Sequence, residues 1–177
     1  MKNRYYIVVL LFLLIGCGDF LKEIHIRDKN FSMKTIPYTG NEIKIDGYYI
    51  NDLDNGLSRV YIFYANGVRF GGSEVITTND IEVKLKASDF TKRYGDNRAC
   101  WGPYEINNNK LMLEFYANRG NMWCTCIAHC EILNDTTFNI EKITFCRTGE
   151  EDKNGIKGIF NFKQFSPKPD STNNFIK

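Results

Sequence analysis

Apolar and polar residues alternate along most of the chain after Glu42, in short runs separated by glycine and asparagine. A period of two places successive side chains on opposite faces of a strand, so this pattern predicts half-buried strands. We expect one helical turn over Ser88–Arg93, with Ser88 as its N-cap and Gly95 as its stop. The alternating runs predict strands at 43–50, 59–65, 68–72, 81–86, 101–106, 110–116, 123–133, 137–145 and 158–165.

The links between these strands are short and rich in turn-forming residues. Asn66-Gly67 is a strong hairpin signal because both turn positions tolerate positive φ. The links at 107–109, 117–121 and 134–136 are also turn-like, so neighbouring strands should pair antiparallel. The fold class predicted is all-β: an antiparallel up-and-down barrel, or a strongly curved sheet, of about eight strands.

A different pattern occupies the N-terminus. Lys2 and Arg4 precede an unbroken apolar run of eleven residues, Tyr5 to Ile15. A membrane-spanning helix needs roughly 20 apolar residues, so this run is typical of a signal peptide, which we assign to residues 1–16.

The end of that run, Leu14-Ile15-Gly16-Cys17, resembles the lipobox of bacterial lipoproteins. The resemblance implies cleavage before Cys17 and acylation of its thiol and new amino terminus. Acyl chains would hold the mature protein on a membrane. The alternative is an ordinary signal peptide in which Cys17 is incidental.

Residues after Cys17 bear on the location. Gly18 implies the outer membrane by the sorting rule of enteric bacteria. Asp19 and Glu23 fall where lipoproteins of Bacteroidetes carry acidic surface-export signals, so the expected location is the periplasmic or the cell-surface face of the outer membrane. The mature chain divides into a lipidated tether (17–41), a β-barrel-like domain (42–166) and a flexible C-terminal tail (167–177).

Composition agrees with a β domain and excludes one class of partner. The 10 tyrosines and 13 phenylalanines suit half-buried pleated surfaces. Without Lys2 and Arg4, the 23 basic side chains fall to 21, which equals the 21 acidic ones. A nucleic-acid-binding protein usually has a basic excess, so we expect no nucleic-acid partner.

Several segments resemble the lipocalin-like β-barrels of small Bacteroidetes lipoproteins. Gly47-Tyr48-Tyr49 takes the place of the Gly-x-Trp motif on the first lipocalin strand. The resemblance implies a small apolar ligand in the mouth of the barrel. The segments that carry it are Asp46 to Tyr49, Phe63 to Val68, Trp101 to Ile106 and Phe165 to Thr172.

Five further cysteines follow Cys17, and three of them lie in the Cys124–Cys130 segment. In a strand, Cys124, Cys126 and Cys130 share one face while His129 points to the other, which disfavours a four-ligand zinc site. We therefore expect no metal and no cofactor. The alternatives are small buried residues or a disulfide.

The disulfide hypothesis depends on the register of one hairpin. If Leu133 pairs with Thr137, then Cys124 lies opposite Cys146, at a separation that a disulfide can span. The same register pairs Ile132 with Phe138, Cys130 with Ile140 and His129 with Glu141.

Candidate catalytic groups are sparse. His25 lies in the tether, and His129 has no evident nucleophile beside it. Glu105 and Glu114 flank one hairpin and could serve a paired-carboxylate glycosidase, although alternating solvent-facing acids explain them more simply. We expect no enzymatic activity.

Four aromatic residues, Tyr48, Tyr49, Trp101 and Tyr104, are candidates for a ligand rim, because amphipathic rings suit half-exposed positions. Packing in the core is the favoured alternative for them. The expected function is non-catalytic binding of a small apolar ligand or an envelope partner. The alternatives are an interaction module with a filled core that contacts protein or polysaccharide, and an envelope hydrolase.

Two turns, Asp135-Thr136-Thr137 and Asp170-Ser171-Thr172, resemble the O-glycosylation sequon of Bacteroidetes, which implies glycans on Thr136 and Ser171. If so, Thr136→Ala and Ser171→Ala should each remove one glycan from the intact mass of protein purified from its host. An unmodified mass for the unaltered protein would contradict this prediction.

Overall fold

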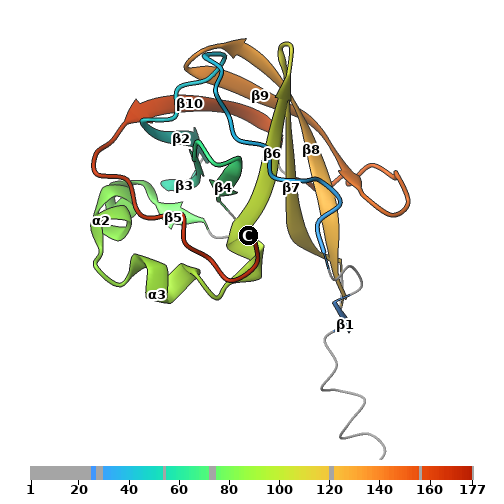
Figure 1. Ribbon diagram of the computed structural model, residues 1–177, viewed down its shortest axis with the longest axis horizontal. Coiled ribbons are helices and arrows are strands. Elements are labelled where there is room, and N and C mark those ends of the chain that lie inside the picture. The colour runs from blue at the N-terminus through green and yellow to red at the C-terminus, as the bar shows by residue number, and fades with distance from the viewer. Residues whose placement is uncertain are drawn as a thin grey trace, which may run out of the picture.

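The computed structural model describes residues 25–26, 30–53, 55–71, 75–119, 122–155 and 157–176. Within these residues, eight strands form a closed barrel (Figure 1). Each barrel strand pairs antiparallel with the next one along the chain, and the last strand pairs with the first. The strands are β2 (Gly47–Asp52), β3 (Leu57–Phe63), β4 (Val68–Phe70), β6 (Trp101–Asn107), β7 (Lys110–Arg119), β8 (Met122–Asn134), β9 (Thr137–Phe145) and β10 (Gly158–Gln164).

This topology confirms the all-β, up-and-down barrel predicted from the sequence, an architecture shared with lipocalins. Pairing of β10 with β2 distinguishes a closed barrel from an open curved sheet. Two short strands add to it: β1 (His25–Ile26) pairs parallel with β8, and β5 (Ile76–Thr77) pairs with β3. The predicted hairpin at Asn66-Gly67 joins β3 to β4, with Gly67 at a φ of +80°.

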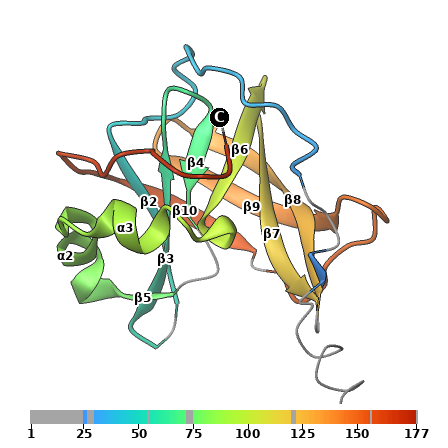
Figure 2. The same cartoon turned by 60° about the horizontal axis from the view of Figure 1, so that its bottom comes forward.

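Helical segments occupy the long link between β5 and β6 and cover one side of the barrel (Figure 2). Here the strand predicted at 81–86 is wrong, because these residues form a helix. Ile81 and Leu85 are buried one helical turn apart, while Val83 between them is 70% exposed. The segments are η1 (Thr78–Asp80), α2 (Ile81–Lys86), α3 (Phe90–Tyr94) and η2 (Arg98–Cys100), so the helical turn expected at 88–93 is present as α3, with Asp89 and not Ser88 at its N-cap.

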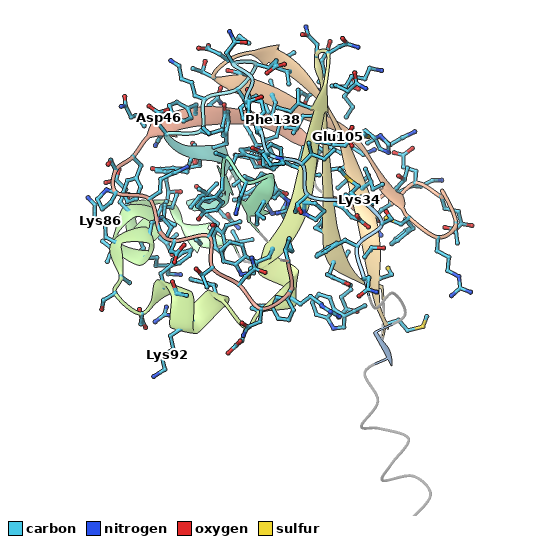
Figure 3. The ribbon with its side chains drawn as sticks, viewed as in Figure 1. Lys34, Asp46, Lys86, Lys92, Glu105 and Phe138 are labelled. Atoms are coloured by element: carbon cyan, nitrogen blue, oxygen red, sulfur yellow. The ribbon has the colours of Figure 1, made fainter. Side chains whose placement is uncertain are left out.

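Aromatic rings fill the inside of the barrel. Phe138 of β9 points into the interior (Figure 3) and stacks on Phe160 of β10, with ring centroids 5.0 Å apart and planes 3° apart. Tyr61 lies 4.9 Å from Phe160, and Tyr49 lies 5.1 Å from Phe138. Phe63 completes this group at 5.5 Å from Tyr49. Contacts of this kind, in addition to the area they bury, stabilise the fold by roughly 0.5–1.5 kcal/mol per ring pair.

A buried cation lies among these rings. Arg69 of β4 has no exposed surface, and its guanidinium lies 5.0 Å from the centroid of the Tyr61 ring. It donates hydrogen bonds to the carbonyl oxygens of Gly71 and Glu114, the latter at 3.2 Å. Burial lowers the pKa of Arg69, but these carbonyl and aromatic contacts accommodate its charge.

A second core lies outside the barrel, where α2 and α3 pack on the outer faces of β2, β3 and β4. Because strand side chains alternate, Tyr49 and Tyr61 face the interior while Ile50 and Val60 face the helices. Phe70 contacts Phe90 of α3 with ring centroids 4.9 Å apart. The outer face of this side of the sheet is therefore as apolar as its inner face.

Residues 30–46 form an irregular segment that runs over the barrel (Figure 1), and we call it the N-terminal strap. One end of the strap is held by Glu114 of β7, which is fully buried. The Glu114 carboxylate accepts hydrogen bonds from the backbone N–H groups of Ser32 at 2.9 Å and Met33 at 2.7 Å. Glu114 is therefore not one of the solvent-facing acids expected from the alternation of β7.

The described C-terminal residues, 167–176, contact the rest of the domain, although the sequence predicts a flexible tail at 167–177. Lys168 donates hydrogen bonds to the carbonyl oxygens of Ile45 and Phe63, the latter at 2.9 Å. The backbone N–H of Asn174 bonds the Gly95 carbonyl at 3.2 Å, and Phe175 packs against the outer core.

The strap generates a first prediction. Glu114→Gln should lower the free energy of unfolding by about 1–3 kcal/mol. The carboxylate has two acceptor oxygens, whereas the glutamine amide has one oxygen and one NH₂ group, so one of the two backbone N–H groups would face another donor. Trypsin should then cut faster after Lys34. Urea denaturation and timed proteolysis measure the two effects.

Glu105→Gln is the matched control, since Glu105 is a half-buried acid on the neighbouring strand β6. We expect it to change neither quantity. Equal urea midpoints for the two variants would contradict the role assigned to Glu114.

Candidate functional site

The four aromatic residues predicted at a ligand rim are buried, each with at most 2% of its surface exposed. Tyr49 and Tyr104 belong to the barrel interior, whereas Tyr48 and Trp101 belong to the outer core. The rim prediction is therefore wrong, and the alternative of core packing describes these residues. Two apolar layers, inside and outside the sheet, leave no half-exposed position for them.

The polar ends of these rings are satisfied by backbone groups. The hydroxyl of Tyr104 donates to the Tyr64 carbonyl at 2.8 Å, and the indole N–H of Trp101 donates to the Tyr94 carbonyl at 2.7 Å. Such hydrogen bonds remove most of the penalty of burying a polar atom. These donors therefore have a structural role within the fold.

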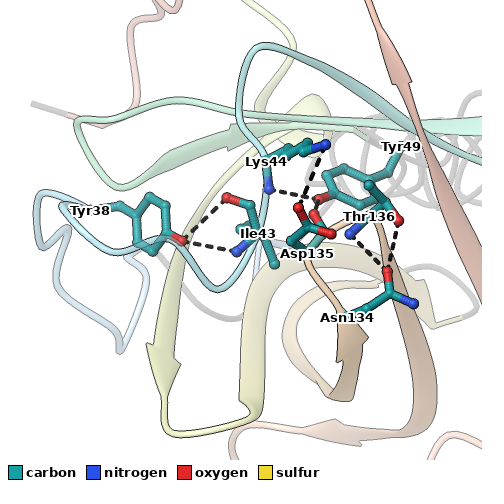
Figure 4. A network of polar contacts seen from close by, with 7 residues as sticks. All are labelled: Tyr38, Ile43, Lys44, Tyr49, Asn134, Asp135 and Thr136. Carbon is teal, nitrogen blue, oxygen red and sulfur yellow. Dashed lines mark hydrogen bonds and ion pairs between the residues drawn. The ribbon is translucent and has the colours of Figure 1, made fainter.

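Tyr49 closes one end of the barrel through a polar network (Figure 4). Its hydroxyl donates to the Asp135 carbonyl at 2.9 Å and accepts from the Lys44 N–H at 3.1 Å. The Lys44 ammonium also pairs with the Asp135 carboxylate at 3.5 Å. Nearby, the Tyr38 hydroxyl accepts from the Ile43 N–H at 3.0 Å. The strap is thereby fixed across the turn between β8 and β9, and burial raises the pKa of Tyr49.

The two predicted glycosylation positions lie on surface turns. Thr136 is in the β8–β9 turn, and its hydroxyl donates to Oδ1 of Asn134 at 2.7 Å. Ser171 accepts a hydrogen bond from Asn66 at 3.3 Å. Both side chains are partly exposed, so the glycosylation hypothesis stays a prediction.

The predicted Cys124–Cys146 disulfide is not formed in the structure, where neither residue takes part in a disulfide bond. The pairs Ile132–Phe138 and Cys130–Ile140 occur as predicted, but Thr137 pairs with Asn134 and not with Leu133. A bulge between His129 and Cys130 then shifts the register, so that Phe145 pairs with Cys126.

The shift places the two cysteines on opposite faces of the sheet. Cys146 follows Phe145, which faces the interior, and the Cys146 N–H bonds the Thr125 carbonyl at 3.0 Å. Cys124 belongs to the barrel interior, whereas the Cys146 thiol lies 3.5 Å from the Glu114 carboxylate on the outer face. The local bulge, which the hydrophobic alternation does not reveal, is the physical reason for the error.

His129 pairs with Lys142 and not with the predicted Glu141, because the same bulge shifts this register. Its Nε2 lies 3.0 Å from the Thr144 hydroxyl. Partial burial, Lys142 and Lys110 together lower the pKa of His129, so its neutral form is favoured. His129, Lys110 and Lys142 border a surface groove of about 530 Å³ at one end of the barrel.

Two further candidate groups are the Glu105–Glu114 pair and the possible metal ligands. Glu114 is engaged by the strap, so it is not available as one of a catalytic pair with Glu105. In the described part of the chain, no three His, Cys, Asp or Glu side chains converge in a way that could hold a metal ion.

A second cleft, of about 420 Å³, lies where the strap, η2, β7 and the C-terminal segment meet. We call it the Arg98 cleft. The Arg98 guanidinium lies 5.1 Å from the centroid of the Tyr116 ring and 5.3 Å from that of Phe175. Lys34, which extends from the strap (Figure 3), provides a second positive charge at this cleft.

The predictions from sequence did not include Arg98. Its neighbours come from positions near 31–35, 116 and 175, which are distant in the chain, and no local motif connects them. The Phe31 ring packs on Tyr116 with centroids 4.8 Å apart, so a residue assigned to the tether forms one wall of this site.

Comparison of the chain with models of known protein families, with curated proteins and with solved structures found no match. None of the helices in the described residues is long and apolar enough to cross a membrane. Cys17 and the signal peptide lie outside the described residues, so lipidation stays a prediction.

The cysteine geometry generates a second prediction. Alkylation in denaturant without reductant should modify all five thiols that the structure describes. In the native protein at about pH 8, iodoacetamide should modify Cys146 slowly, because the thiolate is the nucleophile. Burial raises the pKa of the Cys146 thiol to about 11, so little thiolate is present.

Peptide mass spectrometry measures both effects, and free cysteine in the same buffer provides the reference rate. Two cysteines left unmodified in denaturant would reveal a disulfide and refute the prediction.

Proposed function

We propose that this protein is a non-catalytic binding module that meets its ligand or partner on the outside of a packed barrel. In this proposal the acylated Cys17 tethers the domain to the outer membrane. The barrel is the scaffold, and the strap, the helices and the C-terminal segment provide the outer surface. This corresponds to the interaction module with a filled core, one of the alternatives raised by the sequence.

The observation that carries the proposal is the filled interior. Tyr49, Tyr61, Phe63, Phe138 and Phe160 each have no more than 6% of their surface exposed, and their rings contact one another across the barrel. A barrel that holds a small apolar ligand needs space lined by such side chains. Here the side chains occupy that space, and the Tyr49 network covers one end.

The non-catalytic part of the proposal is supported by how the candidate groups are used. The Glu114 carboxylate accepts backbone N–H groups, and the His129 ring contacts Thr144. A hydrolytic triad would require a carboxylate to orient the histidine, and within the described residues none hydrogen-bonds to His129. An envelope hydrolase is therefore less well supported than a binding module.

The proposal predicts that an apolar ligand enters the barrel only after a ring is removed. Phe138→Ala should destabilise the protein by about 3–5 kcal/mol and leave a cavity. Indole should then bind this variant and raise its melting temperature, whereas the unaltered protein should bind neither indole nor a fluorescent fatty-acid analogue.

Ile159→Ala is the matched control, because Ile159 lies on β10 with 49% of its surface exposed. We expect neither destabilisation nor indole binding for it. Saturable binding of the fatty-acid analogue by the unaltered protein, measured by titration, would overturn the proposal and favour a ligand inside the barrel.

A further inference from the structure

We propose that the Arg98 cleft is a binding site for an oxyanion, a carboxylate or phosphate group, carried on a small molecule with an aromatic or apolar body. The inference deepens the proposed function by naming a surface site and its ligand chemistry. The inference rests on the proposed function only for the premise that ligands bind on the outside of the barrel.

The first argument is that the Arg98 guanidinium is held in place but not paired. Two rings, Tyr116 and Phe175, lie within 5.1 and 5.3 Å of it and restrict its orientation. Its Nε is buried and has no hydrogen-bond partner, and no hydrogen bond or ion pair of its side chain occurs within the described residues. The Nε atoms of Arg59 and Arg69 are also buried without a partner, so the orphan donor alone does not single out Arg98. What singles out Arg98 is that its unpaired guanidinium lies between two rings in a cleft.

Two other arginines of the same chain show the usual arrangements. The Nε of Arg69 is also buried without a partner, but both terminal nitrogens of its guanidinium donate to backbone carbonyls. Arg93 is on the surface and pairs with Asp89 at 3.3 Å. In Arg98 the planar fork of N–H donors is instead left for a group outside the protein, and this fork matches the geometry of a carboxylate or phosphate.

The second argument is the charge of the cleft. Its described lining includes the two cations Arg98 and Lys34 and no aspartate or glutamate. Two positive charges without a compensating acid attract an anion and disfavour a cation. The attraction is stronger where the guanidinium is partly removed from water.

The third argument is the size and the walls of the cleft. A volume of about 420 Å³ falls in the range of small-molecule sites and exceeds what a bare inorganic anion fills. Phe31, Tyr116 and Phe175 present rings, and Ile176 adds an aliphatic wall. The oxyanion would meet Arg98 and Lys34, while an aromatic or apolar body would contact these rings.

The experiment is a calorimetric titration of the full mature chain with three probes: phenyl phosphate, benzoate and inorganic phosphate. We expect binding of phenyl phosphate or benzoate that weakens as sodium chloride rises from about 0.05 to about 0.5 M, because salt screens the attraction. Arg98→Gln should weaken binding by about tenfold or more, the effect of losing a charge-assisted hydrogen bond.

Arg93→Gln is the matched control, since it removes the same charge from an exposed arginine on α3, outside the cleft. Its affinity should equal that of the unaltered protein. Circular dichroism and melting temperature check the fold of each variant. If Arg98→Gln does not fold, Lys34→Gln decides, because Lys34 is exposed and its loss should weaken binding severalfold.

Three results would overturn the inference. The first is that the unaltered protein binds none of the probes at about 10 mM, a concentration that would half-fill a site with a Kd of the same value. The second is equal affinities for Arg98→Gln and Arg93→Gln. The third is an unchanged affinity for Lys34→Gln, where that variant is tested. Equal affinities for inorganic phosphate and phenyl phosphate would refute the assignment of an aromatic or apolar body. These outcomes are independent of the indole titration, so failure of this site and failure of the proposed function are distinguishable.

Discussion

The packing of aromatic rings inside the barrel is the interaction on which the rest of this structure depends. A closed eight-stranded barrel has an interior of fixed width, and large side chains on some strands require small ones on others. Most of the rings come from β2, β3, β9 and β10, with Tyr104 from β6, while β8 contributes Cys126, Ala128 and Cys130. This complementarity explains the cysteine-rich strand as a place for small apolar residues.

In the function proposed here, the filled interior determines where a ligand or partner binds. Because side chains occupy the inside and the strap covers one end, the binding surface has to lie outside the sheet. The helices, the strap and the C-terminal segment provide it. The buried Glu114 holds the strap, and the half-buried Lys168 holds the C-terminal segment. Glu114 accepts backbone N–H groups of the strap, and Lys168 of the C-terminal segment donates to backbone carbonyls. Each charge is satisfied by partial charges of the main chain and needs no ion of opposite sign.

Much of the fold could be predicted from the sequence, because alternation of apolar residues reports the strands directly. The exception at 81–86 is informative. The sequence Ile-Glu-Val-Lys-Leu-Lys satisfies a period of two, but burying only Ile81 and Leu85 satisfies a helix equally well. Which period applies depends on the neighbouring sheet face, and a local pattern does not contain that information.

The candidate site was much less predictable. The aromatic residues chosen for a rim have amphipathic side chains, but whether such a ring is half-exposed depends on what covers the outer face of the sheet. Nor does a local pattern indicate the bulge that separates Cys124 from Cys146. The Arg98 cleft requires the ends of the chain to fold back onto the barrel, which composition and spacing do not specify.

Closure of the barrel has a consequence for the order of events as the chain folds. Gln164 pairs with Gly47, so the first and last barrel strands meet only after nearly the whole domain has been synthesised. Pairings between such distant residues carry a large loop-closure entropy and slow the folding of β proteins. Until then, β2 has an unsatisfied edge and the interior rings remain accessible to water. Slow closure suits a chain that has to cross a membrane unfolded, as the predicted signal peptide requires.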